Sequence, residues 1–359
     1  MLDDACWSRK VNIDARANSH SRVGSPTMPA AILKRRTRFA GSAVTLLKRL
    51  LLALLLWSTP SLAALAPGDY EFSLTHQNLR RSYLVHVPPQ AANRQKLPLV
   101  MNFHGAGSNA AVVRSYTRMD RSADRDGYIV VYPNGSSGFQ GRFLTWNAGN
   151  CCGPAVVLGV DDVGFALAVL DDVSERAAVD TSRVYATGLS NGSMMAYRLA
   201  AEASERIAAV AGVAGTMSLE RFAPRRPIPV MHIHSTQDHI ARYDGGFGPP
   251  SSIADTRMFN VSVEDMLRKW LDFDGCPLRP ALVDTVAGQV GTPDEGHSAI
   301  RRVYRPCRQG TEVVLWQVSG AGHVWPGGVR DYNPQFLGTG TAVIDANTEI
   351  WKFFSRYRR

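Results

Sequence analysis

The feature that most constrains the fold is a tight glycine turn between a strand-like run and a helix-like run. Residues 183–187 favour a strand, Gly188-Leu189-Ser190-Asn191-Gly192 follows them, and residues 193–207 place alanine, methionine and leucine at helical spacing. Strand, G-x-S-x-G and helix in this order are typical of a nucleophile elbow, a strained turn that lifts the serine above a sheet. Glycine is needed two positions to each side because a Cβ would collide in so tight a turn. The pattern predicts that Ser190 is a nucleophile, although G-x-S-x-G alone also occurs in ordinary glycine-rich turns.

The first 63 residues are typical of an export signal rather than of a folded domain. Six basic residues follow Met28 and flank the start of the apolar run 50–57, and small residues end the segment at Ala63. This is the order of a secretory signal peptide, whose apolar core is too short to span a bilayer as a stable helix. We expect cleavage after Ala63, with Ala66 as the less favoured alternative, and no stable membrane anchor afterwards. The sequence thus predicts a secreted or periplasmic protein, with the true start at Met28.

Removal of this segment leaves a nearly neutral protein. The whole chain has a formal net charge of +9, from 40 basic and 31 acidic residues. Residues 1–63 hold 10 of the basic and 3 of the acidic residues, so residues 64–359 carry 30 and 28 and a net charge of +2. So small an excess argues against nucleic acid as a partner, because such proteins carry a strongly basic surface. Residues 64–359 are long enough for a single large α/β domain with a substantial core.

Four cysteines remain once the segment that contains Cys6 is removed. An even number in an exported chain favours disulfides. Cys276 and Cys307 enclose 30 residues that lead towards the last predicted strand, and we expect these two cysteines to be paired. The adjacent Cys151 and Cys152 form either a vicinal disulfide or two buried thiols. No histidine lies at ligand spacing from this adjacent pair, so the sequence predicts no metal site.

Apolar runs with the length of strands alternate along the chain with runs that have helical periodicity. This alternation predicts a mostly parallel central sheet with helices on both faces, the arrangement of an α/β-hydrolase. We expect strands at residues 81–87, 97–103, 128–132, 183–187, 228–234 and 311–318, and helices at 163–173, 193–207, 263–271 and 343–354.

Three residues occur in the order that such a fold needs for nucleophilic catalysis. A serine hydroxyl requires a base to accept its proton, and the base requires an acid to orient it. In an α/β-hydrolase these residues occur as Ser, then Asp or Glu, then His, each in a loop after a strand. Ser190, Asp238 and His323 satisfy this order, because each directly follows one of the predicted strands. We therefore predict a catalytic triad of these three residues.

Other histidines and aspartates nearby are interpreted as structural. His232 and His234 lie within a buried strand, and His104 begins a tight glycine loop that it is expected to brace by hydrogen bonding. Asp161 and Asp162 precede the serine and lie where a helix begins, so we assign them to capping that helix.

The negative charge that develops in acyl transfer needs backbone donors fixed in place beforehand. The run His104-Gly105-Ala106-Gly107 follows a buried strand and is typical of an oxyanion loop. We predict one donor from the amide of Asn191, which follows the nucleophile, and another from Gly105 or Ala106; a simple glycine-rich turn is the alternative. Trp325 and Trp146 are expected to line the substrate pocket, although core packing explains each of them as well.

Several motifs carry a resemblance to a known family, and they extend over nearly all of the chain from about residue 69. They are His104-Gly105, Trp146 before Cys151-Cys152, and the runs 160–165 (VDDVGF), 180–192 (DTSRVYATGLSNG) and 322–327 (GHVWPG). The chain resembles the secreted esterases that comprise polyhydroxybutyrate depolymerases and feruloyl or acetylxylan esterases. The resemblance implies a hydrolase without cofactor, with Ser190 as nucleophile, Asp238 as acid and His323 as base. One departure is His234-Ser235-Thr236, where such proteins carry His-Gly-Thr.

The resemblance implies an ester substrate, with soluble or oligomeric esters favoured over crystalline polymer because no fused substrate-binding module accompanies the domain. Two other interpretations are a serine peptidase of the same fold and a catalytically silent binding protein. A peptidase is disfavoured because the chain lacks the gating domain typical of such peptidases. A silent binding protein is disfavoured because the set of serine, aspartate and histidine is intact.

Overall fold

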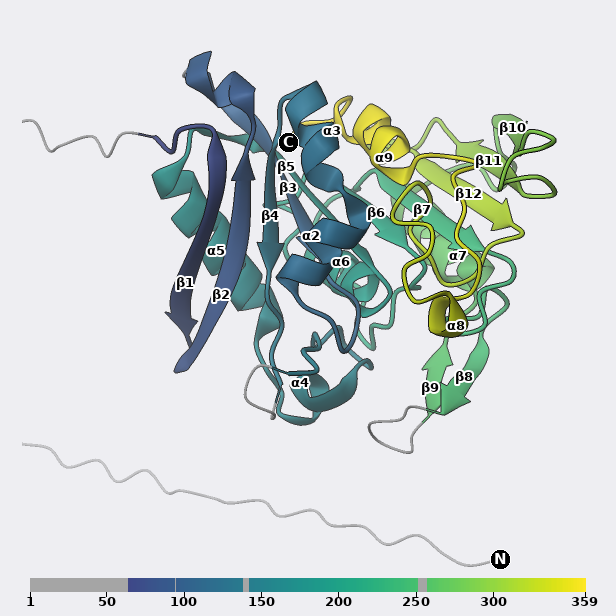
Figure 1. Ribbon diagram of the computed structural model, residues 1–359, viewed down its shortest axis with the longest axis horizontal. Helices are drawn as coiled ribbons and strands as arrows, with labels where there is room; N and C mark the ends of the chain where they lie inside the picture. The colour runs from purple at the N-terminus through teal and green to yellow at the C-terminus, as the bar shows by residue number, and fades with distance from the viewer. Residues whose placement is uncertain (1–63, 94, 138–141, 251–256) are drawn as a thin grey trace, which may run out of the picture. The chain divides into compact units, whose positions relative to one another are not determined.

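The computed structural model of the protein describes residues 64–93, 95–137, 142–250 and 257–359. The predicted signal peptide, with its start at Met28 and its cleavage site after Ala63, lies outside the described residues. Figure 1 shows the folded domain that the described residues form.

A ten-stranded sheet forms the centre of the domain. Its six middle strands, β4 to β12 in spatial order, are mutually parallel, and the antiparallel strands β1, β2, β11 and β10 lie at its two sides. In spatial order the strands are β1 (Gly68–His76), β2 (Leu79–Val87), β4 (Ile129–Pro133), β3 (Leu97–Phe103), β5 (Val179–Leu189), β6 (Ala209–Val213), β7 (Val230–Ser235), β12 (Val313–Ser319), β11 (Ser298–Tyr304) and β10 (Leu282–Ala287). The central strands are buried on both faces, as their continuous apolar sequences predict.

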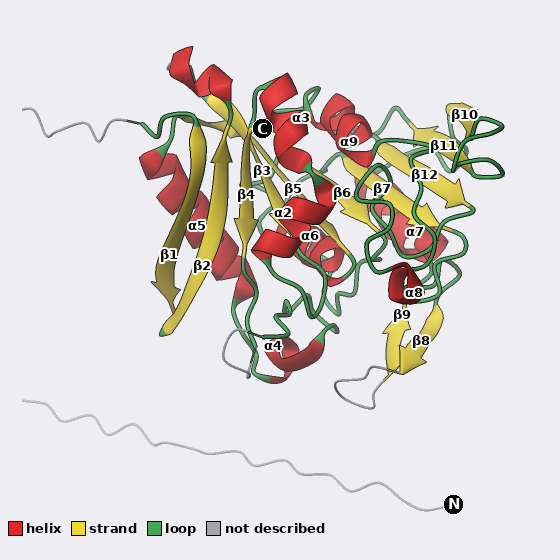
Figure 2. Ribbon diagram, in the orientation of Figure 1, coloured by secondary structure: helices red, strands yellow, loops and turns green. Residues whose placement is uncertain are grey.

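Helices cover both faces of this sheet (Figure 2). One apolar cluster packs α5 (Asp162–Arg176), α6 (Asn191–Glu202) and α7 (Val263–Asp274) against one face. A second cluster packs α2 (Ala110–Thr117), α3 (Met119–Asp126) and α9 (Ala346–Phe354) against the other. The smaller elements are α4 (Gly153–Val157), α8 (Pro334–Leu337), the 3-10 helices η1 (Pro89–Asn93) and η2 (Arg308–Gly310), and the hairpin of β8 (Gly246–Pro250) and β9 (Arg257–Asn260). The predicted α/β-hydrolase architecture is confirmed.

Local sequence signals fix where these helices begin. The side chain of Asp161 accepts a hydrogen bond from the amide of Gly164 (2.9 Å), so Asp161 is the N-cap of α5, as predicted. Within the described residues, no helix combines the length and the apolar character that a membrane crossing requires.

Both cysteine pairs of the domain are joined. Cys276 is bonded to Cys307, which confirms the predicted pairing and links the end of α7 to the segment before β12. Cys151 and its neighbour Cys152 are placed as a bonded pair, the arrangement of the vicinal disulfide that was one of the two alternatives.

Candidate active site

Ser190 lies in a strained turn between β5 and α6. Its φ of 58° and ψ of −123° are values that a residue with a Cβ rarely adopts, and they place it between the last strand residue and the first helix residue. A Cβ on Gly188 would lie 2.7 Å from the carbonyl oxygen of Phe103, and a Cβ on Gly192 would overlap that same oxygen. Glycine at both positions therefore lets the elbow lie directly against the end of β3.

Asp238 and His323 follow β7 and β12, and the structure brings them together. Nδ1 of His323 donates a hydrogen bond of 2.7 Å to Oδ2 of Asp238, and both side chains are buried. The amides of Ile240 and Ala241 donate to Oδ1 of Asp238 at 2.9 and 2.8 Å. Burial raises the pKa of Asp238, but the electrostatic interaction with His323 and the polar contacts of His234 and His323 lower it more, so the pKa is held well below its usual range. An ionised Asp238 keeps the proton of His323 on Nδ1 and leaves Nε2 as an acceptor.

The same edge of the sheet positions all three predicted triad residues. Strands β5, β6, β7 and β12 are neighbours and parallel, so Ser190, Asp238 and His323 all follow carboxyl ends of this one group. The structure thus joins the predicted acid to the predicted base by a hydrogen bond. Among the described residues the Ser190 hydroxyl makes no hydrogen bond, so the link from base to nucleophile remains a prediction.

The predicted oxyanion loop lies beside the serine. A Cβ on Gly105 would lie 3.4 Å from the Cβ of Ser190, so the loop approaches the elbow closely. His104 braces this loop as expected, because its Nδ1 donates to the Gly105 carbonyl (2.7 Å) and its Nε2 accepts from the amide of Gly135 (2.9 Å). Burial lowers the pKa of His104 to about 4, which keeps the ring neutral.

Three backbone amides at this point are available as donors. The Gly107 amide donates to the Leu144 carbonyl at 2.8 Å. Across the part of the chain that the structure describes, the amides of Gly105, Ala106 and Asn191 have no acceptor. These three are the predicted oxyanion donors.

The side chain of Asn191 fixes the elbow to the segment that contains Trp146. Its Oδ1 accepts from the Trp146 amide (2.8 Å) and its Nδ2 donates to the Trp146 carbonyl (3.1 Å), in the manner of two paired strands. The indole Nε1 of Trp146 donates to the carbonyl of His104 (2.9 Å). Trp146 is therefore connected to both halves of the predicted oxyanion hole.

The two tryptophans differ from the expectation that they line a substrate pocket. Trp146 is 0% exposed and Trp325 is 1% exposed, so neither ring presents a face to solvent. The indole of Trp325 donates to Oδ1 of Asn347 on α9 (3.2 Å) within the apolar cluster of that side. Core packing explains Trp325, and support of the oxyanion loop explains Trp146.

Asp162, an alternative candidate for the acid of the triad, has a different role. Asp162 is fully buried, its Oδ1 lies 2.6 Å from the guanidinium of Arg81, and its Oδ2 accepts from the amide of Asn147 (2.7 Å). Asp162 is therefore structural, as expected, but the prediction that it caps the helix is wrong, because Asp161 is the N-cap of α5 and Asp162 pairs with Arg81 on β2. His232 and His234 are buried in β7 as predicted, but Nε2 of His234 also lies 3.2 Å from Oδ2 of Asp238. Sequence reasoning did not foresee this contact, and the H-x-H alternation was its only signal.

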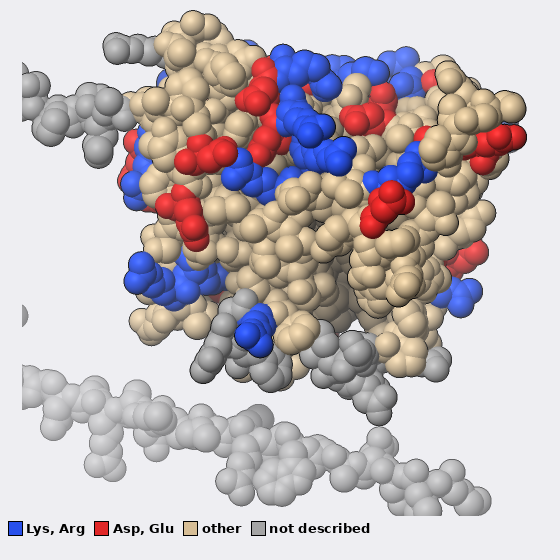
Figure 3. Space-filling model, viewed as in Figure 1, with Lys and Arg blue, Asp and Glu red and all other residues tan. Residues whose placement is uncertain are grey.

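The surface around this edge is mostly uncharged. In Figure 3 charged side chains gather over α2, α3 and α9, whereas few are seen among the described atoms towards α4 and α8, where the surface has a hollow. Large exposed apolar side chains belong to the same edge: Val157 on α4, Leu158 after it, Phe247 on β8, Phe259 on β9 and Phe336 on α8.

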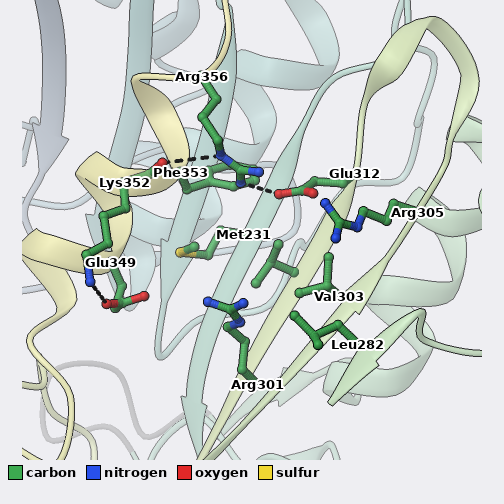
Figure 4. A pocket seen from close by; sticks show the side chains of 11 residues that line it. Met231, Leu282, Arg301, Val303, Arg305, Glu312, Glu349, Lys352, Phe353 and Arg356 are labelled. Atoms are coloured by element: carbon green, nitrogen blue, oxygen red, sulfur yellow. Dashed lines mark hydrogen bonds and ion pairs between the residues drawn. The ribbon is translucent and has the colours of Figure 1, made fainter. Parts of the chain in front are cut away.

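A separate cavity of about 170 Å³ lies between α9 and strands β11 and β12 (Figure 4). Met231, Val303 and Phe353 supply its apolar wall, and the ion pairs of Arg356 with Glu312 and of Lys352 with Glu349 border it. None of its lining residues belongs to the predicted triad or the oxyanion loop.

The mostly parallel sheet, the elbow after β5 and the acid and base loops after β7 and β12 define an α/β-hydrolase. The family described as Esterase PHB depolymerase matches residues 81–252. The putative esterase NocK of Nocardia uniformis subsp. tsuyamanensis is 32% identical over 284 residues, which cover 75% of this chain and 78% of that protein. The chain belongs to the PHB depolymerase and feruloyl esterase family, which confirms the resemblance found in the sequence.

The chain is also similar to other esterases. Feruloyl esterase B of Piromyces equi is 28% identical over 249 residues, which cover 68% of this chain but only 42% of that protein. Among solved structures, an acetyl xylan esterase from Aspergillus awamori is 16% identical, covers 75% of this chain and 99% of that chain, and has a TM-score of 0.47.

Proposed function

We propose that the protein is an exported serine esterase that hydrolyses carboxylic esters through an acyl-enzyme intermediate. Ser190 is the nucleophile, His323 the general base and Asp238 the acid that orients it. The observation that carries the proposal is the 2.7 Å hydrogen bond between His323 and Asp238, at the same edge of the sheet as the strained Ser190.

In this mechanism the Ser190 hydroxyl attacks the ester carbonyl carbon while Nε2 of His323 accepts its proton. The tetrahedral intermediate carries its negative charge on the former carbonyl oxygen, which accepts hydrogen bonds from the amides of Asn191 and of Gly105 or Ala106. His323 then returns the proton to the leaving alcohol, and an acyl group remains on Ser190. Water then attacks this acyl-enzyme by the same steps, which releases the carboxylic acid product and restores the Ser190 hydroxyl.

The proposed substrates are feruloyl and acetyl esters of plant polysaccharides or oligomers of the polyhydroxybutyrate type. The names of the relatives support this range, since one is a feruloyl esterase and the matching family is described by PHB depolymerase. The largely uncharged edge around the site also suits a neutral ester.

We also propose that residues 1–63 are removed during export and that residues 64–359 act as a single domain outside the cytoplasm. The disulfide between Cys276 and Cys307 supports this location, because structural disulfides persist in oxidising compartments. N-terminal sequencing of the exported protein, expected to begin at Ala64, tests the cleavage site.

The central test measures hydrolysis of p-nitrophenyl acetate by the exported protein. Ser190→Ala is expected to lower kcat/KM by at least about a thousandfold with little change in thermal stability. The matched control is Ser174→Ala on α5, whose hydroxyl donates only to the Leu170 carbonyl, and it is expected to keep parental activity. Residual activity of Ser190→Ala within about tenfold of the parent would remove the assignment. A panel of feruloyl, acetylxylan and hydroxybutyrate esters then ranks the substrates.

A further inference from the structure

We propose that His234, supported by His232 and Tyr197, is a positioning residue that orients the carboxylate of Asp238 through Oδ2, the oxygen that also accepts from His323. The inference rests on the proposed function, since it assigns Asp238 as the acid of the esterase. It adds three side chains from β7 and α6 to the machinery, none of which touches the substrate.

A continuous line of side-chain contacts runs from α6 to the acid. The hydroxyl of Tyr197 lies 2.8 Å from Nδ1 of His232, and Nε2 of His232 lies 2.9 Å from Nδ1 of His234. Nε2 of His234 lies 2.6 Å from the Ala241 carbonyl and 3.2 Å from Oδ2 of Asp238. Tyr197 and the two histidines are at most 1% exposed.

The partners of this line determine where its protons lie. Nε2 of His234 faces two acceptors, the Ala241 carbonyl and the Asp238 carboxylate, so it carries a proton. In a neutral ring Nδ1 is then an acceptor, which requires Nε2 of His232 to donate. Nδ1 of His232 in turn accepts from the Tyr197 hydroxyl at 2.8 Å, which is shorter than the 3.2 Å from that hydroxyl to the Met231 carbonyl. The donors of this line therefore all point towards Asp238. Burial lowers the pKa of His232 well below its usual value, which supports the neutral form of that ring.

His234 acts on both parts of the acid loop. Its Nε2 donates to the carbonyl of Ala241 at 2.6 Å and lies 3.2 Å from Oδ2 of Asp238, while the amide of Ala241 donates to the other carboxylate oxygen. One imidazole thus limits both the rotation of the carboxylate and the path of the loop from residue 238 to 241. The titratable groups that face His234 are His232, Asp238 and the ring of Tyr243, whose centroid lies 5.8 Å away and whose hydroxyl donates to Glu264.

Core packing alone does not account for two histidines on a central strand. Alternate side chains of β7 point to one face, where apolar residues would pack at lower desolvation cost. A buried polar network of this kind is favourable only when every member has its partner. Here the network ends on the carboxylate that holds His323, which is the position where orientation affects the reaction.

The test compares two amide substitutions of His234. The amide nitrogen of glutamine reaches the position of Nε2, whereas that of asparagine reaches only the position of Nδ1. His234→Asn removes the donor to Asp238, and we expect kcat for p-nitrophenyl acetate to fall about tenfold to a hundredfold with KM nearly unchanged. His234→Gln keeps the donor and is expected to stay within about threefold of the parent.

The pH dependence of kcat/KM supplies a readout that a purely structural role would not move. When the contact from His234 is removed, the negative charge of Asp238 stabilises the protonated form of His323 more strongly, so that ring stays protonated to higher pH. The acidic limb of the His234→Asn profile is therefore expected to move to higher pH. The low-field proton resonance of the His323 Nδ1 group, identified by its loss in His323→Ala, should move in the same variant. Equal activities of the asparagine and glutamine variants, or an acidic limb that does not move, would overturn the proposal.

Two further measurements keep the outcome clear. If His234→Asn does not fold, Tyr197→Phe removes only the hydroxyl at the far end of the line, and a several-fold loss of kcat without change in KM is expected. Parental kcat in Tyr197→Phe together with an unmoved resonance would then refute the proposal. An inactive parent, or an active Ser190→Ala variant, would instead refute the esterase assignment itself.

Discussion

Asp274 gives the fold a measurable dependence on pH. It is the last residue of α7 and is 0% exposed. Its Oδ1 accepts from the amide of Ile228 at 3.3 Å, while its Oδ2 has no hydrogen-bond partner among the described residues. Burial raises the pKa of Asp274 to about 7, although the Ile228 amide, Arg308 and Arg226 act in the opposite direction. The fold therefore favours the protonated carboxyl.

The sign of the effect follows from the two pKa values. Ionisation of the buried Asp274 lowers the unfolding free energy, because its pKa in the folded state is higher than the ordinary 3.8. This penalty is absent below about pH 4, grows as the pH rises, and is complete above about pH 7. At 1.36 kcal/mol for each unit, the full penalty is about 4 kcal/mol. Asp274→Asn keeps the acceptor for Ile228 and cannot ionise. Burial of the unpartnered amide in the variant costs about as much free energy as burial of the unpartnered hydroxyl in the protonated parent. These two costs therefore cancel when the variant is compared with the protonated parent.

Urea denaturation of parent and variant at pH 4.5 and pH 8 measures this difference. We expect Asp274→Asn to gain about 3 kcal/mol of unfolding free energy relative to the parent between these two pH values. Asp272→Asn, on the same helix with a side chain that is 63% exposed, is the control and should differ from the parent by less than about 0.5 kcal/mol at both. A difference between Asp274→Asn and the parent that is the same at pH 4.5 and pH 8 would refute the reasoning.

Three further predictions concern the elbow, the two aspartates and the disulfide. Gly192→Ala places a Cβ against the Phe103 carbonyl, so the elbow or the oxyanion loop must move, and kcat/KM for p-nitrophenyl acetate should fall by at least about a hundredfold; parental kinetics would contradict this. Asp162→Asn leaves the buried Arg81 without its counter-charge and should cost about 3–5 kcal/mol of unfolding free energy while kcat changes little. Asp238→Asn should instead lower kcat by about ten-thousandfold, and the reverse ranking of the two variants in kcat would mean that the wrong acid is assigned. Replacement of Cys276 and Cys307 by serine together should lower the unfolding free energy by about 2–4 kcal/mol, and peptide mapping without reduction should recover their linkage from the parent.

The middle of the sheet could be predicted from sequence because its strands are buried on both faces. Strands β3 and β4 consist of continuous apolar runs, which leave little alternative to a covered parallel strand. The outer strands β1, β10 and β11 were not predicted, because many of their side chains are only partly buried and the apolar signal is correspondingly weak. Strands at the side of a sheet need little apolar sequence, so periodicity alone does not find them.

The candidate site was predictable where chain order decides it. Ser190, Asp238 and His323 each follow a strand, and parallel strands bring their carboxyl ends to one edge. The positions of side chains relative to other elements were not predictable. Trp325 is buried because it packs against Asn347, 22 residues later on α9, and the link from Tyr197 to His232 depends on how α6 lies over β7.

The hydrogen bond between Asp238 and His323 joins residues that are 85 positions apart, and it forms only where β12 lies beside β7. The chain therefore acquires its base last, after every other part of the proposed site has been synthesised. A growing or partly translocated chain holds the serine and the acid but lacks the histidine that activates the serine, so hydrolytic capacity is postponed until the carboxyl-terminal quarter has folded. For refolding experiments this makes recovered esterase turnover a direct report on the pairing of β12 with β7, separate from the spectroscopic signals of helices that form earlier.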